Sequence, residues 1–560
     1  MNTVMLVLTP LLPLLLAPWL RDTAQRRWLP LAVLPALATA LWLPTGSQLT
    51  LPWLLLGVHL HLDAAAQLLM LLSALIWLLA AISVAASAEQ TRAQIRGQTP
   101  GRRGFMPSFL LAMAGNFIVL LAADAVTFYL GFALMGLSAY GMLVNPRSQR
   151  ARRAARVYLT FTLLGEVALF AGIVLLVAAT GSTLFSDLSG QTLPGAAVAL
   201  LLLGFGIKVA LPGLHLWLPL TYTLAPLTAV AVLSGPMMKA GLLGWIRFLP
   251  ADAAGVAAWG DTLIVLGGLG VAMGVLLGIL QREPRAVLAY SSVAKMGLMS
   301  AIFGVAISDA AHGTTIVAAL LLLAAHHLLV KSSLFLGIVA TARQAGQRWI
   351  LLPFGLLALS LAGAPLMAGH AAKLAIGDAL GGRLAVLLTL SAIGTALLMA
   401  RFMFLLSRRV GVEAGRGNPV ATGAPAKPWL TPVWLVWVPV ASIAPFVPDQ
   451  LGFDVAALQT LGIGLLLAAL AWVATMRWPR LRLRPPARDG LQILASLAHR
   501  AWPTSLRVPK LHWPTTLTRL ASAPQAQPAP AATTGVSLVG AGLRWLSVFL
   551  LLLLAVLSPL

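Results

Sequence analysis

The chain has 560 residues, of which 59% are hydrophobic and only 9% are charged, and its mean hydropathy is +0.91. This composition leaves too little polar surface to cover a water-soluble globule, so we expect the lipid bilayer to be its solvent. The net charge of +23 does not indicate a nucleic-acid partner, because the basic residues lie in short gaps between apolar runs. The absence of cysteine excludes disulfides, thiolate-held iron–sulfur clusters and cysteine nucleophiles, so we expect neither a cofactor nor an electron path here.

Apolar runs long enough to cross about 30 Å of hydrocarbon recur along the whole chain and predict an all-α membrane fold. The first run, Met5 to Trp19, lacks a basic leader and a small-residue cleavage site, so we expect it to be retained as a span. In all, the sequence predicts about sixteen transmembrane helices. They lie near 3–19, 28–44, 64–88, 107–123, 124–145, 157–180, 193–222, 226–249, 254–280, 285–307, 314–340, 350–382, 384–407, 429–447, 455–476 and 537–558.

The charges of the segments between the predicted spans indicate how the chain is oriented in the membrane. If the N-terminus is outside, basic clusters such as 147–156 and 408–416 all fall on the inner side, whereas Asp187, Asp252 and Asp309 fall on the outer side. The positive-inside rule therefore predicts a multi-pass protein of the cell (inner) membrane with both termini outside.

Two predicted spans are broken in the same way, the seventh by Pro212 and Gly213 and the twelfth by Pro365 between Gly363 and Gly369. Such breaks persist in hydrocarbon only where they are buried or line a wet cavity. Because the twelfth span comes five places after the seventh, an odd number, the broken elements run in opposite directions, which predicts two inverted five-helix repeats with a site at each break. The alternative for each break is a packing kink without function.

The predicted organisation has six parts: three N-terminal spans (1–106), repeat A with spans 4–8 (107–249), repeat B with spans 9–13 (250–409), spans 14–15 (410–476), a basic proline-rich inner segment (477–536) and the last span (537–560). Between Arg477 and Arg519 the inner segment has nine basic residues and one acid. This segment is either an amphipathic helix on anionic lipid or on a neighbouring subunit, or a plain basic linker.

Lysine has an unusual distribution. Five of the seven lysines fall inside apolar spans, while arginine supplies nearly all the charge of the loops; these five are Lys208, Lys239, Lys295, Lys331 and Lys373. A desolvated lysine, unlike arginine, can shed its proton and so switch between two protonation states. A lysine that snorkels to a span end is the alternative, and Lys295 fits it best.

Three further residues are candidates for proton transfer. His327 and Lys331 are four residues apart, so they share one helix face and could exchange a proton through water. His215 follows the first break and could line its cavity, and Glu166 is the one acid deep within a predicted span. A lone buried carboxylate needs a proton or a cationic partner, for which Lys208 or Lys239 would serve. A hydrogen-bonded core histidine is the ordinary alternative for His327.

At these residues the chain resembles the antiporter-like subunits of respiratory complex I, Mrp sodium/proton antiporters and membrane-bound hydrogenases, over roughly residues 60–450. In outline it is closest to the largest such subunit of complex I, although prolines in 477–519 rule out that subunit's long lateral helix. The matching stretches run from Lys208 through His215, Trp217 and Pro219 to Lys239-Ala240-Gly241, from Arg285 through Tyr290-Ser291-Ser292 to Met296-Gly297, from His327 through Lys331 to Phe335, and from Gly363 through Pro365 to Lys373.

The resemblance implies that protons move through two half-channels joined by the intramembrane lysines and histidines. It also implies other membrane subunits as partners, because the chain itself has no redox or catalytic site. One departure is that the family's fifth span carries a glutamate where Ala133 follows Phe132 here, and Glu166 is the candidate substitute. Two other functions fit the sequence: an energy-coupling anchor for a cytoplasmic soluble partner, for example in inorganic carbon uptake, and a stand-alone secondary transporter.

Overall fold

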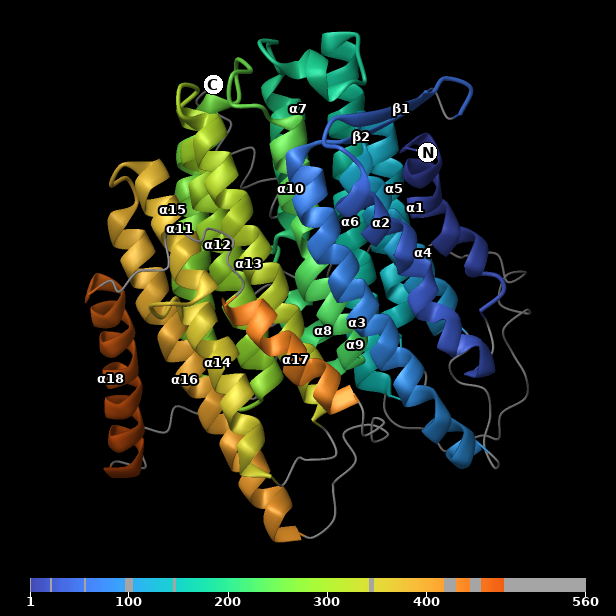
Figure 1. Cartoon of the computed structure of the whole chain (residues 1–560). Coiled ribbons are helices and arrows are strands. Elements are labelled where there is room, and N and C mark those ends of the chain that lie inside the picture. The colour runs from blue at the N-terminus through green and yellow to red at the C-terminus, as the bar shows by residue number, and fades with distance from the viewer. Residues whose placement is uncertain are drawn as a thin grey trace, which may run out of the picture. The chain divides into compact units, whose positions relative to one another are not determined.

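The computed structural model describes residues 2–20, 23–54, 57–95, 104–144, 148–341, 347–416, 430–443 and 455–477, and this part of the chain is mostly helical (Figure 1). The chain divides into two compact units, residues 1–485 and 486–560, and every described residue lies in the first. Apart from Arg477, the predicted basic segment 477–536 and last span 537–560 lie outside the described residues.

The described elements follow the predicted runs in chain order. The α-helices are α1 (Asn2–Leu16), α2 (Leu34–Trp42), α3 (Ala64–Ile95), α4 (Phe105–Leu121), α5 (Ala125–Leu143), α6 (Gln149–Thr180), α7 (Gly195–Lys208), α8 (Trp217–Leu224), α9 (Leu227–Val232), α10 (Met238–Phe248), α11 (Gly260–Ile279), α12 (Pro284–Ser308), α13 (Gly313–Ala340), α14 (Leu351–Ala362), α15 (Ala368–Leu380), α16 (Ala385–Arg416), α17 (Leu430–Ile443) and α18 (Val455–Arg477). Short 3₁₀ segments are Thr23–Val33, Phe185–Leu188, Ala257–Trp259 and Arg348–Ile350, and a π-helical turn, Leu233–Met237, joins α9 to α10.

Among the described residues, eight helices are long and apolar enough to cross a membrane, and shorter apolar helices lie at seven more positions. The two sets together match the first fifteen predicted runs. The eight are Ala64–Ala86, Ala125–Leu143, Gln149–Thr180, Leu227–Phe248, Ala257–Ile279, Pro284–Ser308, Gly313–Ala340 and Ala385–Val410. The prediction of a helical multi-pass membrane protein is therefore confirmed. The count of sixteen spans stays a prediction.

One β-hairpin interrupts the predicted all-α pattern. β1 (Ser47–Leu51) pairs antiparallel with β2 (Val58–Leu62), and buried and less buried residues alternate along β2. The His59 amide donates to Asp124 Oδ2 at 3.0 Å, and Asp124 also caps α5 by accepting from the Thr127 amide at 2.8 Å. This short segment alternates with a period of two, a strand signal that is weak beside the long apolar runs.

An ion pair ties the end of this hairpin to the bundle. Asp63 directly follows β2, caps the first turn of α3 through the Ala66 amide and pairs with Arg247 of α10. Burial by itself raises the pKa of Asp63, but the charge of Arg247 and the hydrogen bonds to the carboxylate outweigh it, so the pKa lies below its usual value. Asp63 therefore stays ionised and holds α3 to α10.

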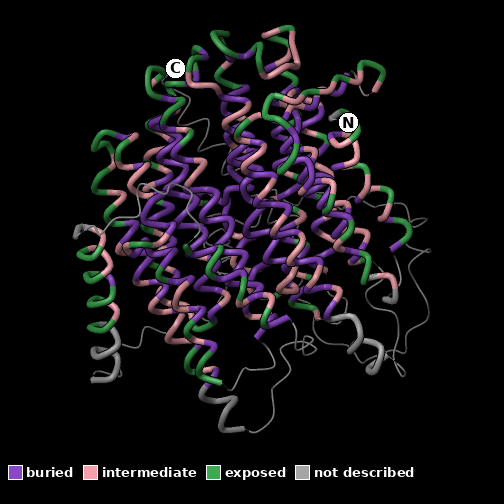
Figure 2. The backbone as a smooth tube through the Cα atoms, in the orientation of Figure 1, coloured by how far each residue is buried: buried purple, intermediate pink, exposed green. Residues whose placement is uncertain are grey.

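Small residues let several helices approach closely. A Cβ on Gly267 of α11 would lie 2.5 Å from the Gly297 carbonyl oxygen and 2.6 Å from the Ala301 nitrogen, both in α12. Gly115 of α4 meets Met135 of α5 in the same way. In hydrocarbon, helix association depends on such packing because lipid is as apolar as the helix surface. Buried residues accordingly run through the middle of the first unit, and exposed residues lie on its outer helices (Figure 2).

The first helix break separates α7 from α8, as the sequence predicts. Residues 209–216 between them are not helical, and both Ala210 (φ 60°) and Gly213 (φ 83°) have left-handed backbone conformations. The indole Nε1 of Trp217 donates to the carbonyl of Ile207 at 2.9 Å. Trp217 thereby satisfies one of the carbonyls that the end of α7 leaves without a helical partner.

The second break separates α14 from α15, and here too a side chain from beyond the break donates to a carbonyl at the end of the first half-helix. Gly363 (φ 80°) and Leu366 (φ 65°) are left-handed, and Lys373 Nζ, one helix further along the chain, donates to the carbonyl of Ala362. A cation at the carboxyl end of a helix also interacts favourably with the helix dipole. In both breaks, a side chain from beyond the break satisfies a carbonyl at the end of the first half-helix.

The contact between Gly363 and Lys373 gives a testable prediction. We expect Gly363→Ala to lower stability by more than the roughly 1 kcal/mol of a left-handed alanine, because its Cβ would lie 2.6 Å from Lys373 Cε and 2.8 Å from Cδ. The matched control is Gly381→Ala, since Gly381 (φ 55°) also ends a helix in the left-handed conformation but has nothing within 4 Å of its Cβ position. Thermal unfolding of both variants in detergent measures the difference, and equal losses would contradict the prediction.

Candidate functional site

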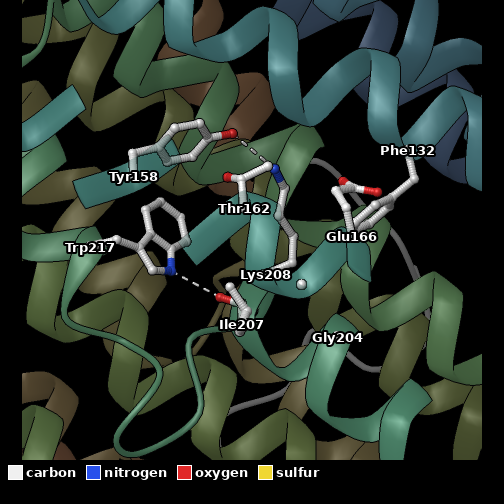
Figure 3. Close-up of a pocket in the computed structure, with 9 residues that line it drawn as sticks. Phe132, Tyr158, Thr162, Glu166, Gly204, Ile207, Lys208 and Trp217 are labelled. Atoms are coloured by element: carbon white, nitrogen blue, oxygen red, sulfur yellow. Dashed lines mark hydrogen bonds between the residues drawn. The ribbon is translucent and has the colours of Figure 1, made fainter. Parts of the chain in front are cut away.

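A pocket behind the first break contains the first of the predicted lysines. Lys208, the last residue of α7, points into a pocket lined by residues of α5, α6, α7 and α8 (Figure 3). Its Nζ donates to Tyr158 Oη at 3.3 Å and lies 5.7 Å from the centre of the Phe132 ring. Tyr158 in turn donates to the Gly136 carbonyl at 3.0 Å. The lysine is thus held by a hydroxyl and aromatic faces, as a cation in an apolar site requires.

Glu166 lines the same pocket as Lys208, which brings together the acid and lysine that the sequence analysis paired (Figure 3). The side chain is buried, and neither carboxyl oxygen has a hydrogen-bond partner among the described residues. Oε1 lies 3.2 Å from the position of a Cβ on Gly136, so the carboxyl group occupies space that α5 leaves open by having a glycine there. Within the described residues Glu166 forms no direct ion pair, so a contact with Lys208 needs a water or a side-chain rotation.

The second lysine is in direct contact with a histidine. Lys239 Nζ of α10 lies 2.7 Å from His327 Nδ1 of α13, and it also lies 3.7 Å from Met296 Sδ of α12. Both Lys239 and His327 are buried, and His327 Nε2 has no partner among the described residues. A lysine and a histidine at hydrogen-bond distance form a unit that can share one proton.

A π-helical turn positions Lys239. Leu233–Met237 contains Pro236 and lies directly before α10, where Ser332 of α13 donates to the carbonyl of Ala231 at 2.8 Å. Gly235 packs against Ser332, so a side chain at position 235 would collide with that serine. The π turn fixes α10 against α13, and π turns of this kind occur frequently at functional sites. The sequence analysis missed it, although the proline within an apolar run was a signal.

Lys331 lies one turn beyond His327 on the same face of α13, as predicted from their spacing. Its Nζ donates to the carbonyl of Leu288 at 2.8 Å and to the Ser291 hydroxyl, both in α12. Ser291 belongs to the matched stretch Tyr290-Ser291-Ser292 but had no predicted role. The serine gives Lys331 a polar partner inside an otherwise apolar helix pair.

Lys295 is buried in α12, which argues against the snorkelling alternative. Like Lys239, His327 and Lys331, it is a buried polar group of the bundle interior. Lys373 itself, on α15, is of intermediate exposure, and its ammonium group is held at the second break.

Two histidines lie near the breaks. His326 Nε2 is 3.0 Å from Ser360 Oγ of α14, and Ser360 donates to the carbonyl of Ser442 in α17 at 3.1 Å. His326 thus links three helices, and neither it nor Ser360 was predicted to take part. His215 is buried beyond the first break, with its ring centre 6.5 Å from that of Tyr290 and no partner for Nδ1 among the described residues.

The central part of the chain matches a known protein family. Residues 122–400, about half of the chain, match the family described as "NADH:quinone oxidoreductase/Mrp antiporter, TM". An uncharacterized protein of Mycobacterium tuberculosis is 32% identical over 268 residues, which are 47% of this chain. The matched part is 40% of that protein, so the chain spans less than half of the relative's length.

Longer matches extend over most of the chain. NADH-quinone oxidoreductase subunit N of Deinococcus radiodurans is 28% identical over 466 residues, covering 74% of this chain and 91% of that subunit. A chain of respiratory complex I from Thermus thermophilus with bound NADH has the same fold, with a TM-score of 0.64, 21% identity, and coverage of 82% of this chain and 99% of that one. Neither a carbon-uptake anchor nor a stand-alone transporter is supported by the matches. The chain therefore belongs to the antiporter-like transmembrane family shared by NADH:quinone oxidoreductases and Mrp antiporters.

Proposed function

We propose that this chain is a proton-translocating, or cation/proton-translocating, membrane subunit of a complex I-like or Mrp-like assembly. The observation that carries the proposal is the buried hydrogen bond of 2.7 Å between Lys239 and His327, with Lys295 and Lys331 near it inside membrane-spanning helices. Side chains of this kind are costly in hydrocarbon and are usually retained there for ion or proton transfer. Family membership supports the same function.

The central transfer is a proton exchange between Lys239 and His327. The Lys239 ammonium gives a proton to Nδ1 of neutral His327, which leaves a neutral amine and an imidazolium. Nε2 of that imidazolium then releases its own proton toward Lys331, one turn away, through water. No net charge is created in this step, so the large cost of adding a charge to the apolar core is avoided.

The two ends of the pathway lie at the helix breaks. Lys208, with Glu166 and His215, forms the half-channel at the break of Pro212 and Gly213. Lys373 forms the other at the break of Pro365, and Lys295 connects it to the central pair. The polar groups that the breaks leave inside the membrane support water entry at these two places.

The wider architecture follows from the same proposal. The matching breaks and the glycine-packed pairs α4–α5 and α11–α12 support inverted repeats over 107–249 (spans 4–8) and 250–409 (spans 9–13). Other membrane subunits are the natural partners, because solved structures with the same fold come from multi-subunit membrane complexes. The energy for transport then comes from a partner, since cysteine-based redox chemistry is not available to this chain.

Lysines 208 and 373 test the proposal through proton conduction. We expect Lys208→Ala and Lys373→Ala to abolish conduction while assembly is preserved, because alanine removes the titrating group and, at Lys208, also relieves a buried charge. Lys208→Arg should fail as well, since a guanidinium keeps its charge but does not release a proton. A pH-sensitive dye in proteoliposomes measures this, with the exposed Arg348→Ala as the control. Conduction by both alanine variants would mean that the break lysines are structural.

Glu166 provides a second test. We propose that it replaces the glutamate absent at Ala133 and stabilises the charged form of Lys208. Glu166→Gln keeps the shape but removes the charge, so conduction should fall strongly, and the double variant Glu166→Gln with Ala133→Glu should recover part of it. Normal conduction by Glu166→Gln would instead show that Glu166 is a protonated group that only packs within the bundle.

Orientation is the third test. We propose sixteen spans with both termini outside, because the basic connections then lie on the inner side. Reporter fusions at Arg150, Arg282, Arg409 and Arg488 should report the cytoplasm, and fusions near Asp187 and Asp309 the outer side. A mixed pattern would contradict both the orientation and the span count.

A further inference from the structure

A second concave site lies at the beginning of α6, away from the lysine and histidine pathway. It is lined by Gln149, Arg150, Arg152, Arg153 and Arg156. All five residues come from the first two turns of this helix. The amide of Ala151 in that turn is already bound by Ser148 Oγ at 3.2 Å, so the arginine side chains are the groups that face the cavity.

For three of these arginines, Arg150, Arg153 and Arg156, the described part of the chain supplies no ion-pair partner. Residues 125–165 contain no aspartate or glutamate. Guanidinium groups crowded on two turns repel one another, and the positive end of the helix dipole adds to that repulsion. The cluster therefore fits an anion supplied from outside the chain.

The length of α6 places this cluster at the membrane surface. The helix has 32 residues, which at 1.5 Å each is about 48 Å, whereas the hydrocarbon core is about 30 Å thick. The apolar part of α6 begins at Val157, so the arginines extend beyond it. We therefore infer that they lie at the depth of lipid headgroups.

An exposed apolar stripe continues from the arginines along α6. Leu163, Val167 and Phe170 are 47%, 69% and 56% exposed, and their spacing of four and three residues continues the helix face of Arg156. The opposite face carries Tyr158, Thr162 and Glu166 toward Lys208 (Figure 3). One face of α6 thus combines cations at headgroup depth with a hydrocarbon surface below them.

We propose that α6 binds an anionic glycerophospholipid, with its phosphate on Arg153 and Arg156 and an acyl chain along Leu163, Val167 and Phe170. Arginine binds phosphate through paired, charge-assisted hydrogen bonds, and basic clusters next to membrane spans favour anionic lipid. The order of the two surfaces along α6, charge and then hydrocarbon, matches the order of groups in a phospholipid. A neighbouring protein helix could cover the same stripe, but it would also need a carboxylate at the arginines.

The test compares lipid binding by the full-length chain in detergent, with native mass spectrometry as the readout. The probes are phosphatidylglycerol, phosphatidylcholine, water-soluble glycerophosphoglycerol and inorganic phosphate. We expect phosphatidylglycerol to bind most tightly, and Arg153→Gln with Arg156→Gln to weaken it about 30-fold, at about a factor of five for each basic residue. The variant with lysine at both positions should keep most of the binding.

The matched control is Arg348→Gln with Arg408→Gln, which removes two exposed charges elsewhere and should leave lipid binding unchanged. Unfolding temperatures equal to the original chain establish that each variant is folded. Equal affinity for phosphatidylcholine, or unchanged phosphatidylglycerol binding in the double glutamine variant, overturns the proposal. So does equal affinity for free phosphate, which would mean an ion site. Finally, if phosphatidylglycerol is missing from the chain purified within its native complex, a neighbouring subunit covers this surface and the proposal fails.

Discussion

The hydrogen bond between Lys239 and His327 is the interaction on which the interior of this protein depends. It joins α10 to α13 in the centre of the bundle, where neither group has access to bulk water. The π-helical turn before α10 and the contact of Ser332 with the Ala231 carbonyl hold the two helices at the required separation. A charged side chain buried in hydrocarbon is tolerated only beside a polar partner. Helices α10 and α13 must therefore keep Lys239 and His327 within hydrogen-bond distance.

The same constraint explains the broken helices. Each break exposes carbonyls in the membrane interior, and each is compensated by a side chain from the segment that follows, Trp217 for Ile207 and Lys373 for Ala362. Lys373 therefore has two linked roles, because the group proposed to carry a proton also caps a helix. Loss of a proton from Lys373 would weaken this cap, which couples protonation to the local geometry of the second break.

Acidic side chains are scarce in the interior of the bundle, so Glu166 matters for the charge balance around the lysines. The cations outnumber it, and the carboxyl group occupies space next to Gly136 that a larger residue of α5 would fill. In the proposed pathway, this acid on α6, next to a glycine of α5, takes the place of the acid expected on α5. The two helices still enclose the same pocket around Lys208.

Much of this protein was determined by its sequence. Apolar runs fixed the positions of the helices, because hydrocarbon requires about 20 apolar residues for each span. Proline and glycine located both helix breaks, because they leave backbone groups without helical partners. The concentration of lysine in the spans identified the intramembrane cations, because a charged side chain is costly in hydrocarbon. The hairpin 47–62 escaped notice because its alternation is short and its anchor, Asp124, is distant in sequence.

Only the tertiary structure decided which polar groups meet. The spacing of four residues placed His327 and Lys331 on one helix face, but it did not show that His327 contacts Lys239, which is 88 residues away, or that Lys331 contacts α12. The contacts of Tyr158 with Lys208 and of Ser291 with Lys331 could not be predicted either. A hydroxyl group within an apolar run does not indicate which residue of another helix it will contact. Residue spacing determines the face of one helix, whereas contacts between helices depend on how closely glycines let the backbones approach.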